Sequence, residues 1–380
     1  MKLFTKDLTF CTMRILFVHC IRKEKFGGGE KWLVAAAAGL SELGHDVAIG
    51  GRPGSKLFLA AAAAGVKTVG INIFSDISIY HVFRVYHYIR KHKTDVVITR
   101  STDLTVTGLA AALARRKYGK PFVVVRHGLP MIYAIRKHVF LLNKLAQGII
   151  TNTNSIRDEY ERKKYFPPGF TRVIHNGIIP SEDRTAIDFG ARFPGKRIVL
   201  SAGRLAYQKG YSYLADAIAL LPEAYDDLQF VILGKGKLHG KLLAHARKEN
   251  VLHRMHFEGF VENVHPYIHG CEFFVLPSLY EGMPNAAMEA MAAGKAVILT
   301  KVNGTPELVS DPGLGMLVPA KSPRALAASI MKLADDPLLR NSMGKKAAQH
   351  MRDGFSMKAM ISSIESYLHE ICSTHSSTQT

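Results

Sequence analysis

The 380-residue sequence contains no run of 18 or more uncharged apolar residues, so we expect no helix that spans a membrane. It is also poor in cysteine, and its four cysteines are scattered: Cys11, Cys20, Cys271 and Cys372. No pair of them has the spacing of a metal site or a redox motif, and the histidines are dispersed as well. We therefore predict no structural metal and a reducing, cytoplasmic environment. The opening residues, MKLFTKDLTFCT, are too few and too polar for a signal peptide, and we expect residues 1–12 to be an extension outside the fold.

Negative charge is scarce in the N-terminal half of the chain. Residues 1–178 contain 28 Lys and Arg against 11 Asp and Glu, a net charge of +17, whereas residues 179–380 contain 22 against 20, a net charge of +2. A basic half of this kind attracts an anionic partner, which is a nucleic acid, an anionic lipid or a phosphorylated substrate. The chain has no recognition module that interleaves aromatic and basic residues, so we expect no nucleic-acid partner.

Short β-rich runs alternate with helical patterns along the first half. The predicted strands include RILFVH (14–19), DVAIG (46–50), VVITR (96–100), FVVVRH (122–127) and GIITN (148–152). Alternation of this kind predicts a parallel sheet with helices on both faces.

The alternation stops at residues 176–197, which are rich in Pro, Gly and charge, and we interpret this stretch as a connection between domains. A second series of predicted strands follows at 197–203, 229–236, 255–260, 273–278, 296–300 and 315–319. We therefore predict an α/β fold of two Rossmann-like doubly wound domains, 13–178 and 179–356, with a ligand cleft between the carboxyl ends of their strands. A C-terminal helix, 357–372, is expected to pack back on the first domain, and 373–380 to be a disordered tail.

Two loops of the second half follow predicted strands and contain residues suited to phosphate. SAGRLAYQKG places Arg204 and Lys209 five positions apart, which suits a diphosphate, although two solvated cations are the alternative. ILGKGKL has Gly234 and Gly236 before a helix, where backbone N–H groups can approach a phosphate. A turn from strand to helix often needs glycine in any case.

The stretch SLYEGMPNAAMEAMAAGKAVIL (278–299) combines two carboxylates with a turn and a helix start. Pro284 suits the first turn of a helix, so residues 278–285 would present free backbone N–H groups and a positive helix end to a polar ligand. Glu289 lies about 7 Å beyond the helix start at ~1.5 Å per residue, and Glu281 precedes it. Two carboxylates separated in this way fit the sugar and the ribose of a nucleotide sugar. Two glutamates without the turn between them would instead indicate an ordinary helix surface.

Taken in order, FGGGEKW, LSELGHDV, GRLAYQKG, EGMPNAAMEAMAAGKAVI and NGTPELV resemble the retaining GT-B glycosyltransferases of family 4, over nearly all of residues 13 to 372. The resemblance implies a nucleotide-diphosphate-sugar donor on the second domain, with no other cofactor. It implies that Arg204 and Lys209 grip the diphosphate, that Glu281 meets the sugar and that Glu289 meets the ribose. The remaining donor-site residues that it implies are Gly28 and Gly29, in a loop that closes over the phosphates, Phe260 and Val261 at the base, and Gly234, Gly282, Met283, Pro284 and Asn285.

His127 ends a predicted strand of the first domain, where it is expected to face the cleft. Its place matches a His or Asp that many members of the family set beside the donor sugar. Because the family retains the anomeric configuration without needing a protein nucleophile, the resemblance implies a positioning or electrostatic role for His127. A lone histidine is more often structural, and Arg126 could fill part of this role instead.

The function that the resemblance implies is a retaining hexosyltransferase that acts on a glycan acceptor. A lipid-linked acceptor, from lipopolysaccharide or another cell-envelope glycan, is the expectation; a sugar-nucleotide epimerase of the same fold and a soluble acceptor are the alternatives. A dinucleotide oxidoreductase is disfavoured because FGGGEK lacks the G-x-G-x-x-G spacing. Residues 84–93 and 129–148 mix cations with apolar residues, which predicts that the first domain lies on the anionic inner face of the cytoplasmic membrane. An ordinary core is the alternative for their apolar residues.

Overall fold

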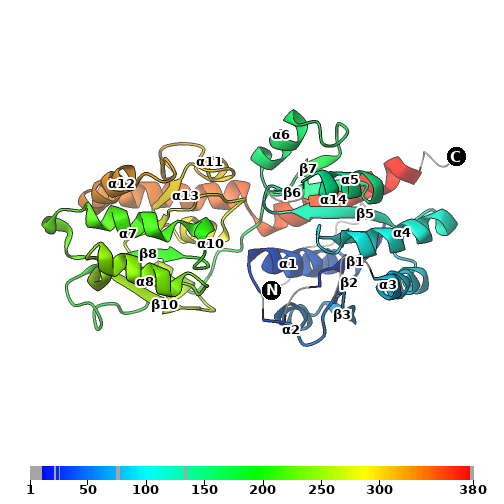
Figure 1. The fold of residues 1–380 in the computed structure, drawn as a ribbon, viewed down its shortest axis with the longest axis horizontal. Helices are drawn as coiled ribbons and strands as arrows, with labels where there is room; N and C mark the ends of the chain where they lie inside the picture. The colour runs from blue at the N-terminus through cyan, green and yellow to red at the C-terminus, as the bar shows by residue number, and fades with distance from the viewer. Residues whose placement is uncertain (1–10, 21–22, 25, 74–77, 132–134, 377–380) are drawn as a thin grey trace. The chain divides into compact units, whose positions relative to one another are not determined.

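The structure is a computed structural model that describes residues 11–20, 23–24, 26–73, 78–131 and 135–376. The chain divides into two compact units (Figure 1). Unit 1 extends to Gly177 and resumes at Met357, and unit 2 is Ile178–Ser356. Most of the predicted N-terminal extension, residues 1–10, lies outside the described residues.

Unit 1 is built on a seven-stranded parallel sheet with the order β3-β2-β1-β4-β5-β6-β7. The strands are β1 (Arg14–Val18), β2 (Asp46–Gly51), β3 (Lys67–Gly70), β4 (Val96–Thr99), β5 (Phe122–His127), β6 (Gly148–Thr151) and β7 (Thr171–Val173). The helices are α1 (Gly28–Glu42), α2 (Lys56–Ala63), α3 (Ile79–His92), α4 (Leu104–Tyr118), α5 (Ile135–Leu145), α6 (Asn154–Arg162) and α14 (Met357–Ser376).

Unit 2 repeats this architecture with a six-stranded parallel sheet of order β10-β9-β8-β11-β12-β13. The strands are β8 (Arg197–Ala202), β9 (Leu228–Leu233), β10 (Met255–Gly259), β11 (Phe273–Leu276), β12 (Val297–Thr300) and β13 (Met316–Val318). The helices are α7 (Tyr211–Ala219), α8 (His239–Lys248), α9 (His265–Gly270), α10 (Asn285–Ala292), α11 (Thr305–Leu308), α12 (Pro323–Asp335) and α13 (Pro337–Gly354), with 3₁₀ turns η1 (Tyr207–Lys209), η2 (Glu223–Tyr225) and η3 (Leu252–Arg254).

The strand order confirms the predicted pair of Rossmann-like doubly wound folds. Each order reverses once, between β1 and β4 and between β8 and β11, and ligands of such sheets bind beyond the carboxyl ends of the strands at this reversal. Central strands such as β4 and β11 are apolar and buried throughout, because helices cover both faces of a parallel sheet. The prediction missed β3 and β7, which are short edge strands of mixed polarity with no buried residue.

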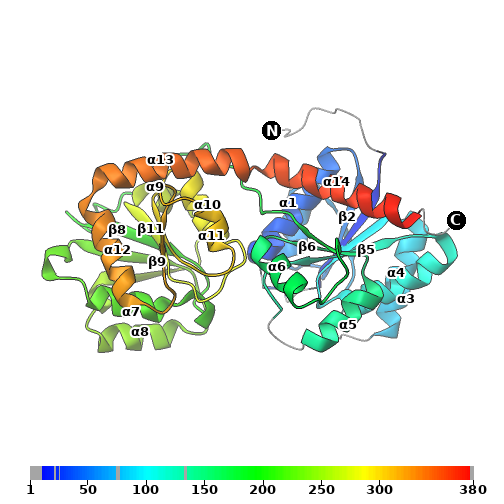
Figure 2. The same ribbon diagram turned by 90° about the horizontal axis from the view of Figure 1, so that it is seen from above.

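The two faces of the unit 1 sheet have separate cores. One core joins β1, β4 and β5 to α1 and α14, and the other joins alternate residues of the same strands to α3, α4 and α5. Figure 2 shows α14 beside α1 over the sheet. A Cβ on Gly39 of α1 would lie 2.0 Å from Ile361 Cδ1 of α14, so glycine is needed for this close approach.

The boundaries of two predicted segments differ from the observed ones. The α14 helix reaches Ser376 rather than Cys372, so part of the expected tail is helical, and residues 377–380 lie outside the described residues. The chain leaves unit 1 at the start of the predicted connection 176–197. The rest of that stretch belongs to unit 2, where Phe189 is buried. Of the described helices, none combines the length and the hydropathy needed to cross a membrane.

Candidate functional site

Several of the predicted donor residues of unit 2 meet at the carboxyl edge of its sheet. Arg204 follows β8, Gly234 follows β9 and Glu281 lies in the loop between β11 and α10. Because β9, β8 and β11 are neighbours in the sheet, these loops lie next to one another. The site therefore sits at the strand reversal, where this type of fold binds ligands.

Glu281 is the most deeply buried acid of this edge, with 4% of its surface exposed. Its carboxylate accepts hydrogen bonds from Lys209 Nζ at 2.5 Å, from Ser278 Oγ at 2.6 Å and from Gln208 Nε2 at 3.4 Å. The Lys209 side chain is 15% exposed, so this ion pair is shielded from water. The two residues predicted to contact opposite parts of the donor are thus bonded to each other, a link that the sequence analysis did not anticipate.

The turn that carries Lys209 is held against β11 by a glycine. Gly210 has a φ of 63°, in the left-handed region, and a Cβ there would lie 2.0 Å from the carbonyl oxygen of Pro277. Leu279 N–H also donates to the carbonyl oxygen of Gln208 at 2.7 Å. These contacts join the 3₁₀ turn η1 to the 277–281 loop and place Lys209 beside Glu281.

Gly234 was predicted to approach a phosphate, and close packing of the backbone already requires a glycine at this position. Its φ is 146°, and a Cβ there would lie 1.9 Å from the carbonyl oxygen of Gly203. Its N–H donates to the carbonyl oxygen of Gly259 at 2.6 Å, which joins it to the loop of Phe260 and Val261. Phe260 is 53% exposed, with Lys235 Nζ 5.5 Å from its ring centroid, and Val261 is half-buried. The glycine therefore brings the predicted base-binding loop next to Gly203.

The α10 helix begins one residue later than predicted. Pro284 is the N-cap residue, and Asn285 is the first helical residue. Gly282, Met283 and Pro284 are buried, whereas Asn285 and Glu289 are half-buried. Glu289 is therefore partly accessible on α10, whereas Glu281 is buried in its ion pair with Lys209.

In unit 1 the glycines expected to close over the phosphates lie at the start of a helix. Gly28 and Gly29 form the first turn of α1, and Gly27 is its N-cap residue. The Gly27 N–H donates to Glu30 Oε2 at 2.8 Å, which satisfies a backbone donor at the helix N-terminus. The Glu30 carboxylate thus caps α1, and the role of Gly28 and Gly29 at the donor phosphates stays a prediction.

A buried ionic network behind this turn was missed. His19 Nε2 lies 3.0 Å from Glu30 Oε1, and His19 Nδ1 lies 3.2 Å from Asp103 Oδ2. Arg100 Nη1 also donates to Glu30 Oε1 at 3.0 Å. Burial opposes ionisation of both His19 and Glu30. Nevertheless, its hydrogen bonds to Asp103 and Glu30 raise the pKa of His19. The hydrogen bond from His19 and the charge of Arg100 lower the pKa of Glu30 to about 2. The one available signal was that His19 and Arg100 each end a predicted strand.

His127 was expected to face the cleft, but it is 5% exposed and both ring nitrogens have protein partners. Nε2 lies 2.7 Å from Ser101 Oγ, and Nδ1 lies 2.8 Å from the Tyr160 hydroxyl on α6. Burial and neighbouring cations lower the pKa of His127 to about 3. The imidazole thus ties β5 to α6, and its role beside the donor sugar stays a prediction.

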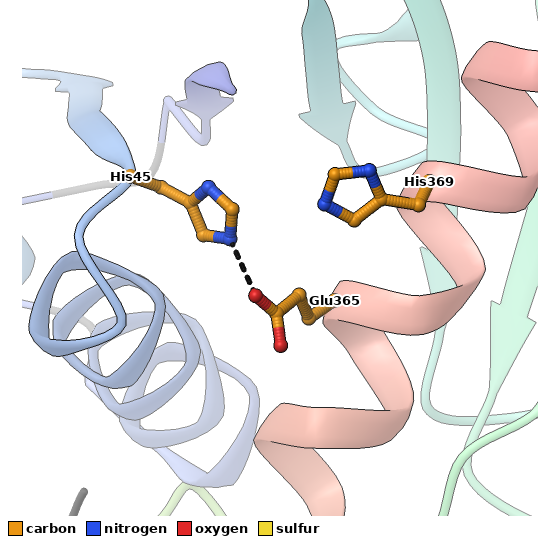
Figure 3. A group of neighbouring side chains, drawn as sticks. All are labelled: His45, Glu365 and His369. Carbon is orange, nitrogen blue, oxygen red and sulfur yellow. Dashed lines mark hydrogen bonds and ion pairs between the residues drawn. The ribbon is translucent and has the colours of Figure 1, made fainter. Parts of the chain in front are cut away.

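Among the residues that the structure describes, two groups of side chains have the composition of a metal site. The ligand atoms of His45, Glu365 and His369 lie within 4.8 Å of one another (Figure 3). The Met13 N–H donates to His45 Nδ1 at 3.1 Å, so Nε2 carries the ring proton, which points to Glu365 Oε1 at 3.0 Å. A metal ion would have to replace that proton, and the arrangement favours a hydrogen bond that fixes α14.

The second group contains Asp216 of α7, His245 of α8 and Glu249, the C-cap residue of α8. His245 Nε2 is 2.6 Å from Asp216 Oδ1, an ion pair or hydrogen bond that joins the two helices without an ion. The absence of a structural metal stays a prediction.

Family models match both halves of the chain. Residues 183–350 match the model described as Glycosyl transferases group 1, and residues 26–182 match the model described as Glycosyltransferase Family 4. The chain is 28% identical over 319 residues to the UDP-Gal:alpha-D-GlcNAc-diphosphoundecaprenol alpha-1,3-galactosyltransferase of Escherichia coli, an alignment of 79% of this chain and 81% of that protein.

A second relative and a solved structure cover still more of the chain. The lipopolysaccharide core biosynthesis glycosyltransferase LpsE of Rhizobium meliloti is 25% identical over 88% of this chain and 94% of its own length. The crystal structure of HepE of Anabaena in complex with UDP superposes with a TM-score of 0.81 over 94% of this chain and all of that chain, at 20% identity. That likeness concerns the fold.

Proposed function

Because the chain belongs to the group 1 glycosyltransferases, we propose that it transfers a sugar, with retention of configuration, from a nucleotide-diphosphate sugar to a lipid-linked glycan acceptor. The donor lies on unit 2, with its diphosphate at Arg204 and Lys209, its sugar at Glu281 and its ribose at Glu289. The acceptor is a glycan of the cell envelope on a lipid carrier. Support for this choice comes from the two relatives, whose names specify a diphosphoundecaprenol acceptor and lipopolysaccharide core synthesis.

The observation that carries the proposal is the position of Arg204, Lys209 and Glu281 at the strand reversal of unit 2. A diphosphate at Arg204 would draw Lys209 partly away from Glu281, because the ammonium can share its three donors between two anions. The freed oxygen of Glu281 would then accept a hydrogen bond from a sugar hydroxyl. Donor binding and positioning of the sugar would thus be coupled through one ion pair.

The proposal is tested by incubating the protein with UDP-sugars, with and without a lipid-diphosphate-linked sugar acceptor. A transferase releases UDP in proportion to the acceptor consumed, and the product keeps the anomeric configuration of the donor. Conversion of the donor to an isomer without acceptor would instead identify an epimerase. Transfer to a water-soluble sugar at the same rate would contradict the lipid-linked acceptor.

Arg204→Ala is expected to weaken nucleoside diphosphate binding about tenfold to a hundredfold, because it removes a charge-assisted contact of roughly 1.5–3 kcal/mol. Glu289→Gln should also weaken binding of the nucleotide, by a smaller factor. Titration calorimetry with UDP measures both. Arg247→Ala, an exposed arginine of α8 in the same unit, is the matched control. Equal affinities for the Arg204 and Arg247 variants would remove Arg204 from the donor site.

We also propose that unit 1 docks on the anionic inner face of the cytoplasmic membrane through α3, α4 and α5. These helices are neighbours, and they expose large apolar side chains: Ile79 (72%), Tyr80 (66%), Phe83 (51%), Leu109 (40%), Leu113 (42%) and Phe140 (61%). In the described part of α5 only Leu142 and Leu145 are buried, so most of its predicted apolar face is not core. Residues 132–134 of the predicted basic helix lie outside the described residues. Apolar side chains beside exposed Arg and Lys suit an anionic lipid surface.

Co-sedimentation with vesicles tests this docking surface. The protein should bind vesicles that contain anionic lipid and release as the salt concentration rises. Joint substitution of Arg136, Lys137 and Lys144 by Glu should abolish binding, because each cation near the surface contributes about 1 kcal/mol. The same change at Lys241, Arg247 and Lys248 of α8 in unit 2 is the control. Binding that resists salt, or that is lost equally in both triple variants, would refute docking by unit 1.

A further inference from the structure

Three polar side chains stand in a row at the carboxyl edge of the unit 1 sheet. Val18 pairs with Thr99, and Thr99 pairs with Val125, so the next residues of the three strands, His19, Arg100 and Arg126, are successive neighbours. Alternation along a strand places all three on the face covered by α1 and α14. The row crosses the strand reversal between β1 and β4, where a doubly wound sheet binds ligands.

Within this row one cation lacks a counter-charge. The imidazole of His19 lies between Glu30 and Asp103, and Arg100 shares Glu30 with it. Arg100 Nη1 also lies 3.3 Å from His19 Nε2. Both carboxylate oxygens of Glu30 are occupied, one by His19 and Arg100 and the other by the Gly27 N–H. Both carboxylates are thus bonded to His19 and Arg100, and neither bonds to Arg126.

Arg126 is 7% exposed, and it has no carboxylate partner among the described residues. Its Nη2 donates to Asn176 Oδ1 at 3.0 Å, its guanidinium lies 4.2 Å from the Trp32 ring centroid, and its Nε has no acceptor. The indole Nε1 of Trp32 is likewise buried without an acceptor. Burial and the charge of Arg100 lower the pKa of Arg126 to about 9, and the charge of Glu30 opposes this shift.

Two glycines let the backbone lie close against the two guanidinium groups. A Cβ on Gly128 would lie 2.6 Å from Arg126 Nη1, and a Cβ on Gly29 would lie 3.1 Å from Arg100 Nη1. Arg100 also has 37% of its side chain exposed, so a ligand can reach it. The first turn of α1, at Gly28 and Gly29, adds backbone N–H groups and the positive end of a fifteen-residue helix.

We propose that Arg100 and Arg126, with the first turn of α1, form a phosphate site that holds the phosphate or diphosphate of the acceptor. A phosphate oxygen supplies the acceptor that the buried Arg126 lacks, and planar guanidinium groups bind such oxygens in pairs. This inference rests on the proposed function, because it assigns the anion to the acceptor. The E. coli relative, named for a diphosphoundecaprenol acceptor, uses an acceptor of that chemistry. The donor diphosphate has its own cations, Arg204 and Lys209, in unit 2.

The test is titration calorimetry of the full chain with inorganic diphosphate, first alone and then in saturating UDP. We expect a diphosphate site that remains when UDP is saturating, and that farnesyl diphosphate also occupies. Arg126→Gln and Arg100→Gln should each weaken it about tenfold or more while UDP affinity stays within about twofold of wild type. Arg115→Gln, a half-buried arginine of α4 that donates to Gln147 Oε1, is the control and should leave diphosphate binding unchanged.

Melting temperatures show whether each variant is folded. Since Arg126→Gln removes a buried side chain, Gly128→Ala is a second probe, because its methyl group pushes on Arg126 Nη1 and should weaken diphosphate binding in a folded protein. Wild-type diphosphate affinity in both arginine variants would overturn the site. Loss of diphosphate binding in saturating UDP would assign the anion to the donor and overturn the acceptor phosphate. If UDP does not bind at all, the proposal of a nucleotide-sugar donor is refuted. The titration with diphosphate alone still tests whether Arg100 and Arg126 bind phosphate.

Discussion

Replacing Glu281 with alanine is expected to reduce sugar transfer about 100-fold or more and to lower the free energy of unfolding of unit 2 by roughly 3–5 kcal/mol. The stability loss follows from burial: Glu281 is 4% exposed, and its carboxylate is the partner of the Lys209 ammonium at 2.5 Å. Removing the carboxylate leaves Lys209 shielded from water with no counter-charge. The loss of transfer follows because the sugar loses an acceptor and Lys209 loses its position.

A double variant separates these two effects. Lys209→Met and Glu281→Gln together remove both charges and keep the side-chain volume, so most of the stability should return. Transfer should not return, because neither the cation nor the carboxylate remains. Chemical unfolding followed by far-UV circular dichroism and a transfer assay measure the two quantities. An alanine variant within about 1 kcal/mol of wild type would show that the pair contributes little, and transfer by the double variant would exclude Glu281 from the reaction.

The fold could be predicted from the sequence because its signals are local. Runs such as VVIT and FFVL are buried on both faces, so they are apolar throughout and stand out between helical patterns. In a parallel sheet the carboxyl ends of all strands share one edge, so the residues after each run could be assigned to the ligand side before the strand order was known. Arg204, Gly234 and Glu281 were found in this way.

The contacts between those residues could not be predicted in the same way. Lys209 and Glu281 are 72 positions apart, and His19 and Asp103 are 84 apart, so their pairing depends on strand order and not on local pattern. The Glu30 carboxylate caps α1 through the Gly27 N–H, a contact that the glycine run itself does not indicate. His127 ends a strand as expected, but alternation turns it toward Tyr160 and turns Arg126 toward α1.

Glu30→Gln is expected to destabilise unit 1 by roughly 3 kcal/mol at neutral pH, because a carboxyl pKa lowered from 4.5 to about 2 represents a stabilisation of that size. The substitution leaves His19 and Arg100 without the charge that they share. Trp32 is the single tryptophan of the chain, and it lies buried in α1, so its fluorescence reports the unfolding of unit 1. Glu161→Gln, at an exposed ion pair of α6, should change the unfolding free energy by less than about 0.5 kcal/mol.

The pH dependence gives this prediction a second readout. Glu30 has a lowered pKa in the folded state, so its stabilisation is complete above about 4.5 and is lost as the pH falls toward 2. His19 has a raised pKa, so its stabilisation is complete below about 6.5 and is lost as the pH rises through the folded value. Wild-type unit 1 should therefore gain most from this network between those two limits. Glu30→Gln should lose less stability than wild type as the pH falls from 4.5, because the group that titrates there is gone. Parallel acid profiles for the two proteins would mean that Glu30 is not ionised in the network.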